Sequence, residues 1–234
     1  MSIGWCYPSS EGRVDAVIVD YGTPALAARC LDSLGEHPLF ASIASVDAKA
    51  LGWSYARSVN TALRAGSAEI VLALNADTRM LEAPTVILDL FDMDPTVGVV
   101  GPRQVTSDGR ITHGGIFGRN EAPAFRAWQM PLGDFDAATA DTRDAITVSG
   151  SVYFARRTVW EQCGGFLDTS HFYEETWLSY LARHRGYRVL YAGSTTWIHE
   201  FNQSPVDGAW RARVAAESRE RFRAACAAEG IACD

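Results

Sequence analysis

The first hundred residues alternate short apolar runs with stretches of helical periodicity, and this alternation constrains the fold more than any other feature. The runs at 14–20, 41–47 and 69–74 are nearly continuous in apolar residues, as is typical of strands buried on both faces. Capping residues and apolar positions at helical spacing predict a helix after each run, and 97–100 follows as a fourth strand. We therefore predict an α/β fold with an open, mostly parallel sheet and helices on both faces.

The composition is typical of a globular protein. The chain has 234 residues, of which 47% are hydrophobic and 21% charged, enough to bury a core in one domain. It has no apolar run of about 18 residues and no signal-peptide pattern at its start, so we expect no integral membrane segment and a cytoplasmic location. The net charge of −7 argues against nucleic-acid binding, and five cysteines without a CxxC pair argue against a zinc ribbon or disulfide framework.

After residue 100 the alternation is lost. Residues 101–147 are rich in Gly, Asp and Pro, which predicts a long, partly ordered insertion of the kind that is often functional. Strand character returns at 146–156, a helix is expected near 173–185, and two short strands are expected within 188–199. The segment 209–234 predicts a helical tail rich in Ala and Arg, which could pack on the domain or serve a partner or a membrane surface.

Polar residues stand where the predicted strands end. Tyr21 and Asp47 follow the first two strands, Asn75 and Asp77 follow the third, and His199 ends the last one. Taken singly, such residues more often form turns or caps, but ligands of open α/β sheets bind at this edge. The phosphate-binding patterns GxGxxG and GxxxxGK[ST] are absent from the sequence, which argues against a dinucleotide enzyme or a P-loop NTPase.

Two acidic stretches carry the candidate chemistry. Asp77 could hold a divalent cation that neutralises a diphosphate, and a histidine ligand from His199 would favour Mn²⁺ slightly over Mg²⁺. Glu174 and Glu175 open a predicted helix, where the helix dipole alone would favour acidic residues. A carboxylate at the mouth of a cleft can also act as a general base that takes a proton from a hydroxyl group.

In this order, the segments resemble an inverting family 2 glycosyltransferase of the GT-A fold, of the rhamnosyltransferase-like branch. The resemblance covers residues 14 to about 199. It rests on VDAVIVDY (14–21), Val46-Asp47, Gly52-Trp53-Ser54-Tyr55-Ala56-Arg57, Asn75-Ala76-Asp77, Gly150 followed by Arg156-Arg157, Gly164-Gly165-Phe166, Glu174-Glu175, Arg183-His184-Arg185-Gly186-Tyr187 and His199.

The resemblance implies a GT-A domain over residues 1–208, with a nucleotide-sugar-binding half at 14–100 and an acceptor-binding half at 101–200. It implies transfer of one sugar from a UDP- or dTDP-sugar to an acceptor hydroxyl with inversion. The acceptor class (glycan, lipid-linked glycan or small metabolite) and the oligomeric state stay open. The implied roles are nucleotide binding for Tyr21, Asp47, Arg57, Asn75 and Asp77, binding of Mn²⁺ or Mg²⁺ for Asp77 and His199, general base for Glu175, and sugar or acceptor contacts for His113, Gly150, Glu174 and Trp177.

Three departures from the family pattern keep an alternative open. Glu175 stands where the family has an Asp, the segment from Asp47 to Gly52 is short, and residues 58–60 replace the usual Asn-x-Gly. They are compatible with a catalytically inactive module that binds a nucleotide sugar or a partner. A phosphatase of the haloacid dehalogenase type is disfavoured, because its second Asp would fall on Gly22 in IVDYGT.

Overall fold

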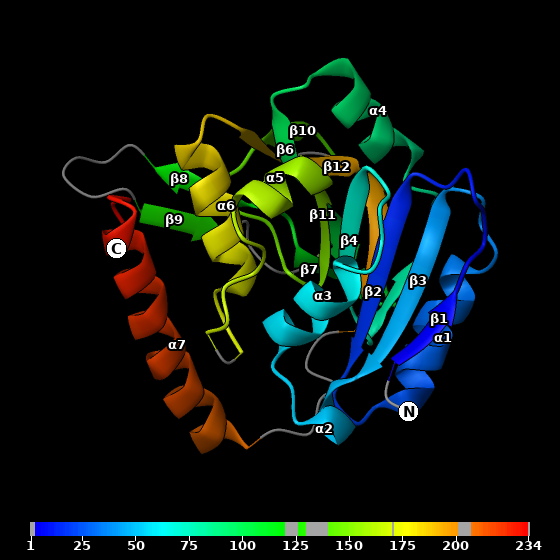
Figure 1. Ribbon diagram of the computed structural model, residues 1–234. Helices are drawn as coiled ribbons and strands as arrows, with labels where there is room; N and C mark the ends of the chain where they lie inside the picture. The colour runs from blue at the N-terminus through cyan, green and yellow to red at the C-terminus, as the bar shows by residue number, and fades with distance from the viewer. Residues whose placement is uncertain (1–2, 120–125, 130–139, 170, 201–206, 234) are drawn as a thin grey trace.

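One large mixed sheet organises the molecule, and Figure 1 shows helices on both of its faces. The computed structural model describes residues 3–119, 126–129, 140–169, 171–200 and 207–233. The strand order is β1-β3-β2-β4-β11-β6-β12-β10. The central strands are β3 (Phe40–Asp47), β2 (Val14–Asp20), β4 (Ile70–Asn75), β11 (Val152–Arg156), β6 (Val97–Val105) and β12 (Arg188–His199).

Five of these six strands run in the same direction. β2 pairs in parallel with β3 and β4, β6 pairs in parallel with β12, and β11 lies antiparallel between β4 and β6. The predicted fold class is therefore confirmed, although the placement of β11 between the third and fourth parallel strands was not predicted.

The other strands lie at the sheet margins or in the predicted insertion. β1 (Ile3–Cys6) and β10 (Thr142–Asp144) form the antiparallel edges, β5 (Thr78–Met80) pairs with β12, β7 (Ile111–His113) pairs with β6, and β8 (Ile116–Arg119) pairs with β9 (Arg126–Gln129). Residues 120–125 and 130–139 of that insertion lie outside the described residues. The two strands predicted within 188–199 are one strand, because an irregularity between Ala192 and Thr196 interrupts the ladder without ending it.

The two faces of the sheet bury different side chains, as the alternation along a strand requires. On one face Ile18, Leu72 and their neighbours pack against α1 (Pro24–Leu34) and α4 (Thr85–Met93). On the other face Val17, Tyr153 and their neighbours contact the second group of helices. These are α3 (Tyr55–Leu63), α5 (Arg157–Gln162), α6 (Glu174–His184) and α7 (Gly208–Ala228), and α2 (Ala48–Leu51) is a short turn of helix after β3. Within the described ranges, the helices are too short or too polar to cross a bilayer.

Two residues set the ends of α1, as their positions in the sequence predict. α1 begins at Pro24, whose fixed φ suits the first helical position. It ends at Gly35, which takes a positive φ of 56° that residues with side chains rarely adopt. The start of the helix lies beside the carboxyl end of β2, where the Thr23 N–H donates to the Asp20 Oδ1 at 2.6 Å.

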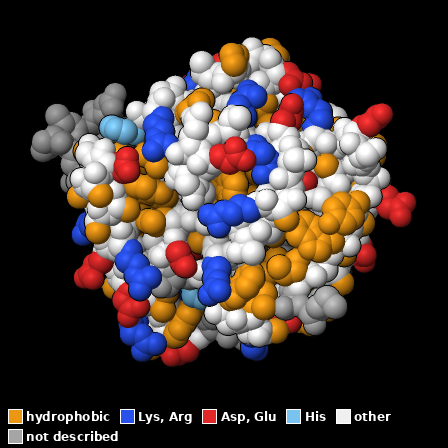
Figure 2. Space-filling model, viewed as in Figure 1, with side chains coloured by type: hydrophobic (Ala, Val, Ile, Leu, Met, Phe, Trp, Pro, Cys, Tyr) orange, Lys and Arg blue, Asp and Glu red, His pale blue; other side chains and the backbone are white. Residues whose placement is uncertain are grey.

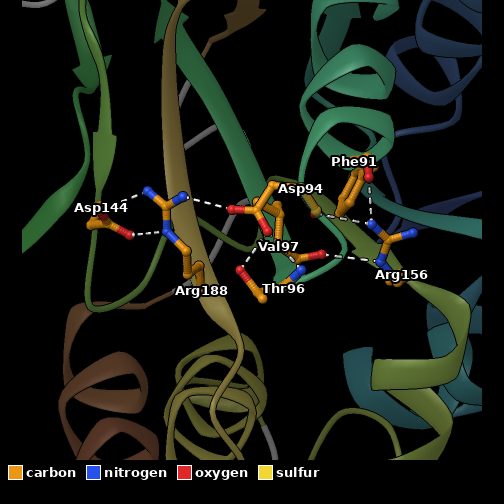
Figure 3. Close-up of polar contacts among 7 residues, drawn as sticks. All are labelled: Phe91, Asp94, Thr96, Val97, Asp144, Arg156 and Arg188. Carbon is orange, nitrogen blue, oxygen red and sulfur yellow. Dashed lines mark hydrogen bonds and ion pairs between the residues drawn. The ribbon is translucent and has the colours of Figure 1, made fainter.

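The Arg156–Arg157 pair anchors the amino-terminal edge of the sheet. Arg156 donates to the carbonyl oxygens of Phe91 (2.6 Å) and Val97 (3.1 Å), which ties β11 to α4 and β6 (Figure 3). In the same view Arg188 bridges Asp94 and Asp144 with nitrogen–oxygen distances of 2.8 Å. This network lies at the opposite end of the parallel strands from the polar residues predicted to form a site.

Arg157 instead makes a buried ion pair with Asp15 of β2. Its Nη2 lies 2.7 Å from the Asp15 Oδ2, and Asp15 is only 3% exposed. The guanidinium also donates to the carbonyl oxygens of Leu63 (2.9 Å) and Ala68 (2.5 Å), and the Ala68 N–H donates to Asp15 at 2.8 Å. The pair therefore joins β2, the end of α3, the loop before β4 and the start of α5.

We expect Arg157→Met to lower the free energy of unfolding by about 3–5 kcal/mol, because Asp15 would remain buried without its cation. Urea denaturation measures the loss. Arg13→Met is the matched control, since Arg13 pairs with Glu69 and Asp92 at the surface, and it should cost less than about 1 kcal/mol. Equal losses for the two variants would contradict a central role for the buried pair.

Candidate active site

A cleft of about 630 Å³ opens at the carboxyl ends of the parallel strands. Its volume lies in the range of small-molecule sites. Its lining comes from the ends of β2, β4 and β12, from α2 and α3, from the turn before β11, from the start of α6 and the residues before it, and from the start of α7. The lining residues are Val19, Tyr21, Thr23, Lys49, Tyr55, Asn75, Ala76, Asp77, Ser149, Gly150, Ser151, His171, Phe172, Tyr173, Glu174, Glu175, His199, Trp210 and Arg211.

Asp77 and His199 meet at the base of this cleft although they lie far apart in sequence. β5 turns back from β4 and pairs with β12, which sets Thr78 opposite His199. The His199 Nε2 then lies 3.5 Å from the Asp77 Oδ1, with both side chains largely buried. Burial lowers the pKa of His199, which favours the neutral imidazole despite the opposing charge of Asp77.

A carboxylate beside a neutral imidazole fits Mn²⁺ or Mg²⁺, with oxygen ligands from elsewhere completing the shell. Across the described ranges, no group of three or more His, Cys, Asp or Glu side chains forms a closed metal cage. The Asp77–His199 pair supplies two ligands of the kind that a cation site shared with an anionic ligand uses.

Glu174 and Glu175 begin α6 and also line the cleft. Glu174 is 2% exposed, and its Oε1 has no hydrogen-bond partner among the described residues. Burial, followed by the charge of Glu175, raises the pKa of Glu174 well above its usual range. Burial also raises the pKa of Glu175, while the backbone amides of Glu175, Thr176 and Gly150 act in the opposite direction. A pair of buried carboxyl groups with raised pKa values is typical of acid–base sites.

Gly150 leaves the space that the Glu175 side chain occupies. A Cβ atom at position 150 would lie 3.1 Å from the Glu175 Cδ, closer than side chains normally pack. The Tyr55 hydroxyl donates to the Gly150 carbonyl oxygen at 2.6 Å and fixes this turn. The turn before β11 thus positions the carboxylate that the sequence singled out.

The structure brings together many of the residues predicted to form a site. Tyr21, Asn75, Asp77, Gly150, Glu174, Glu175 and His199 all line the cleft. His113 is buried behind the wall, where its Nε2 accepts the Ser149 N–H at 3.1 Å and burial lowers its pKa to about 3. Trp177 is packed in the core beneath α6.

Asp47 and Arg57 do not line the cleft. Asp47 accepts the Ala50 N–H at 2.9 Å and so caps α2. The Arg57 guanidinium lies over the Trp53 ring, 4.8 Å from its centroid. Tyr21 stays on the cleft and donates from its hydroxyl to the Trp53 carbonyl oxygen at 2.9 Å. Nucleotide contacts by Asp47 and Arg57 therefore stay predictions.

Sequence reasoning missed several lining residues, among them Lys49, Ser149, Ser151, Trp210 and Arg211. Lys49 is the one lysine beside twenty arginines in the sequence, a signal that could have marked it. Its side chain lies against Gly22, where a Cβ atom would come within 2.7 Å of the Lys49 Cδ. Trp210 reaches the cleft only through the packing of α7, and no local pattern marks it.

The chain is similar in sequence or in structure to several known proteins. No family model matches the sequence. The O-antigen biosynthesis protein RfbC of Myxococcus xanthus is 26% identical over 159 residues, which are 65% of this chain but only 12% of that protein.

Solved glycosyltransferases superpose over most of the chain. The mannosyltransferase PcManGT from Pyrobaculum calidifontis, in complex with GDP-Man and Mn²⁺, matches with a TM-score of 0.58 and 18% identity, covering 93% of this chain and 66% of that one. TarS of S. aureus (residues 1–349) matches with a TM-score of 0.54 and 11% identity, covering 89% and 71%. The GT-A glycosyltransferase fold indicated by the sequence is thereby confirmed.

We expect Glu174→Gln to stabilise the protein at pH 7, because the substitution removes a buried carboxyl group whose pKa is raised by burial. The folded state binds the Glu174 proton more tightly than the unfolded state, so this residue's contribution to stability falls as pH rises above the ordinary glutamate value of 4.5. The gain should therefore vanish near pH 4. Urea denaturation at both pH values is the measurement, and a gain that is equal at the two would contradict the assignment.

Proposed function

We propose that this chain is an inverting glycosyltransferase that moves one sugar from a UDP- or dTDP-sugar to an acceptor hydroxyl, with Glu175 as the general base. One observation carries the proposal: a candidate cation-binding pair, Asp77 and His199, and a buried carboxyl pair line the same cleft in a chain with the GT-A fold. On this proposal, residues 14–100 bind the donor and residues 101–200 bind the acceptor.

The donor diphosphate would lie against the carboxyl ends of β2 and β4. Tyr21 and Asn75 line that side of the cleft and would orient the nucleoside. Asp77 and His199 would hold the cation, which stabilises negative charge on the leaving diphosphate when bound. Support comes from PcManGT, whose solved complex contains Mn²⁺ and a nucleotide sugar.

Glu175 would take the acceptor's proton. As the hydroxyl oxygen forms its bond to the anomeric carbon, the bond from that carbon to the diphosphate oxygen breaks on the opposite face, which inverts the centre. The proton passes to the Glu175 carboxylate. Burial raises the pKa of this carboxyl group, which makes its ionised form a stronger base than an exposed glutamate.

A glycan or lipid-linked glycan is the acceptor class that we favour over a small metabolite. The similarity to RfbC, whose name places it in O-antigen biosynthesis, supports this choice. We place the reaction in the cytoplasm, where nucleotide sugars would serve as donors. A module that binds nucleotide sugars without turnover is the alternative, favoured by the position of Asp47 and Arg57 away from the cleft.

Calorimetric titration of UDP, dTDP and GDP, with and without Mn²⁺, tests the donor site. We expect Asp77→Asn and omission of Mn²⁺ each to weaken the preferred nucleotide at least tenfold, because either change removes part of the cation site. Asp108→Asn is the control, since Asp108 contacts Thr106 on an exposed turn. Binding that is indifferent to Mn²⁺ and to Asp77 would rule out this donor site.

Glu175→Gln tests the base. We expect Mn²⁺-dependent turnover of UDP- and dTDP-sugars to fall about 10²–10⁴-fold, since the amide cannot accept the proton, while the Kd of the nucleotide stays the same. The wild-type rate should fall as pH drops through the raised pKa of Glu175, above the ordinary value of 4.5. The exposed Glu161→Gln is the control. Nucleotide binding without turnover in the wild type would favour the inactive module.

A further inference from the structure

The loop that leads into the carboxyl pair is held from outside by α7. We call residues 168–169 and 171–173 the approach loop, because Glu174 follows it directly. The buried Ser218 hydroxyl of α7 donates to the Thr169 carbonyl oxygen at 2.7 Å, and Arg221 donates to that of Asp168 at 3.4 Å. The N-terminal half of the loop is therefore fastened to the middle of α7.

Tyr173 at the end of the approach loop is strained. It has φ 72° and ψ 7°, and in the described part of the chain it is the one residue other than glycine with a positive φ. This left-handed conformation is unfavourable for a residue with a Cβ atom and persists only where the surroundings enforce it. The contacts around Tyr173 therefore have to hold it in this conformation.

α7 supplies those surroundings. The Tyr173 ring stacks on Phe222 with centroids 5.3 Å apart and an interplanar angle of 19°, and the Arg219 Nε donates to the Tyr173 hydroxyl at 3.2 Å. Phe222 also contacts Tyr180 of α6 edge-on at 5.5 Å. Phe222 thus contacts both Tyr173 and Tyr180, and α7 holds the Tyr173 ring by a stacking contact and a hydrogen bond.

The conformation of Tyr173 sets where α6 starts. Tyr173 is the residue before α6, and its carbonyl oxygen accepts the Trp177 N–H at 2.9 Å, the first bond of the helix. A change in its φ and ψ would redirect the next two side chains, Glu174 and Glu175. The carboxyl pair therefore depends on a clamp that lies outside the cleft.

The two faces of α7 differ as expected for a helix that packs on the domain. Figure 2 shows side chains of both charge signs along the outside of this helix, whereas Val214, Phe222 and Cys226 are buried on its inner face. Near its start, Trp210 contacts His171 edge-on at 5.0 Å and lines the cleft. The helix predicted from the tail packs on the domain, one of the alternatives that the sequence left open.

We propose that α7 is a positioning element for the reaction: through Phe222 and Arg219 it holds Tyr173 in the left-handed conformation that directs Glu174 and Glu175 into the cleft. Phe222 and Arg219 act through Tyr173 and do not touch the substrate. This inference rests on the proposed role of Glu175 as base.

Tyr173→Gly and Tyr173→Ala form the sharpest pair of variants. Both remove the ring and its contacts with α7, but glycine adopts the left-handed conformation readily and alanine does not. We expect kcat for donor turnover in the alanine variant to be at least fivefold below that of the glycine variant, with donor KM within twofold. Equal kcat values would overturn the proposal, because the backbone conformation would then not matter.

Arg219→Ala with Arg223→Ala tests the clamp itself. Both arginines are exposed on α7, and only Arg219 has a hydrogen bond to Tyr173. We expect Arg219→Ala to lower kcat at least threefold and to move the acid limb of the pH profile to lower pH, because a looser loop admits water to the carboxyl pair. Arg223→Ala should behave as wild type. Identical profiles for both would contradict the clamp.

Carboxyl titration by NMR with ¹³C-labelled glutamate separates this inference from the proposed function. The pKa of Glu175 should fall toward its ordinary value in Tyr173→Ala and Arg219→Ala but not in Arg223→Ala. The other titratable or charged groups near the pair are not substituted in these variants; they are Tyr21, Lys49, Tyr55, Asp77, Asp168, His171, His199 and Arg211. Unchanged titrations overturn the positioning role, whereas shifted titrations without turnover in the wild type overturn the proposed function alone.

Discussion

The buried ion pair between Asp15 and Arg157 is the constraint on which the rest of the structure depends. It connects β2 to the end of β11, and these strands run in opposite directions on either side of β4. Their other ends form two walls of the cleft, Tyr21 after β2 and Gly150 before β11. Because burying both charges is costly, the pair holds only in the geometry that satisfies its hydrogen bonds. The pair thus fixes one end of two strands whose other ends flank the cleft.

The antiparallel strands explain how distant residues reach one site. In a purely parallel sheet, the start of a strand would lie at the edge away from the ligand. β11 reverses this, so the turn that carries Gly150 arrives beside Glu175. The short strand β5 pairs with the end of β12 and brings His199 to Asp77. Each of these pairings brings one more segment of the chain to the sheet edge at which β2 and β4 end.

Local sequence signals predicted the main helices and strands. Features that depend on contacts between distant parts of the chain were not predicted. Pro24 and Gly35 mark the ends of α1 through their own backbone preferences, and the apolar runs identify β2 and β4. The expectation that ligands bind where parallel strands end also placed Tyr21 and Asp77 at the cleft, because each residue follows its own strand closely. The position of β11 and the approach of Trp210 depend on partners far away in the chain, which periodicity does not encode. Asp47 also ends a strand but does not line the cleft, because its side chain caps the short helix that follows it.

The residues that break local rules are consecutive and stand where the chemistry is proposed. Tyr173 has a strained backbone, Glu174 buries an oxygen without a partner, and Glu175 has a raised pKa in the same helical turn. Each lowers stability, and such conflicts are expected at functional sites rather than elsewhere. The packing of Phe222 offsets part of this cost from outside the cleft. A glutamate in place of aspartate at the proposed base fits this arrangement, because its longer side chain reaches into the space that Gly150 leaves empty.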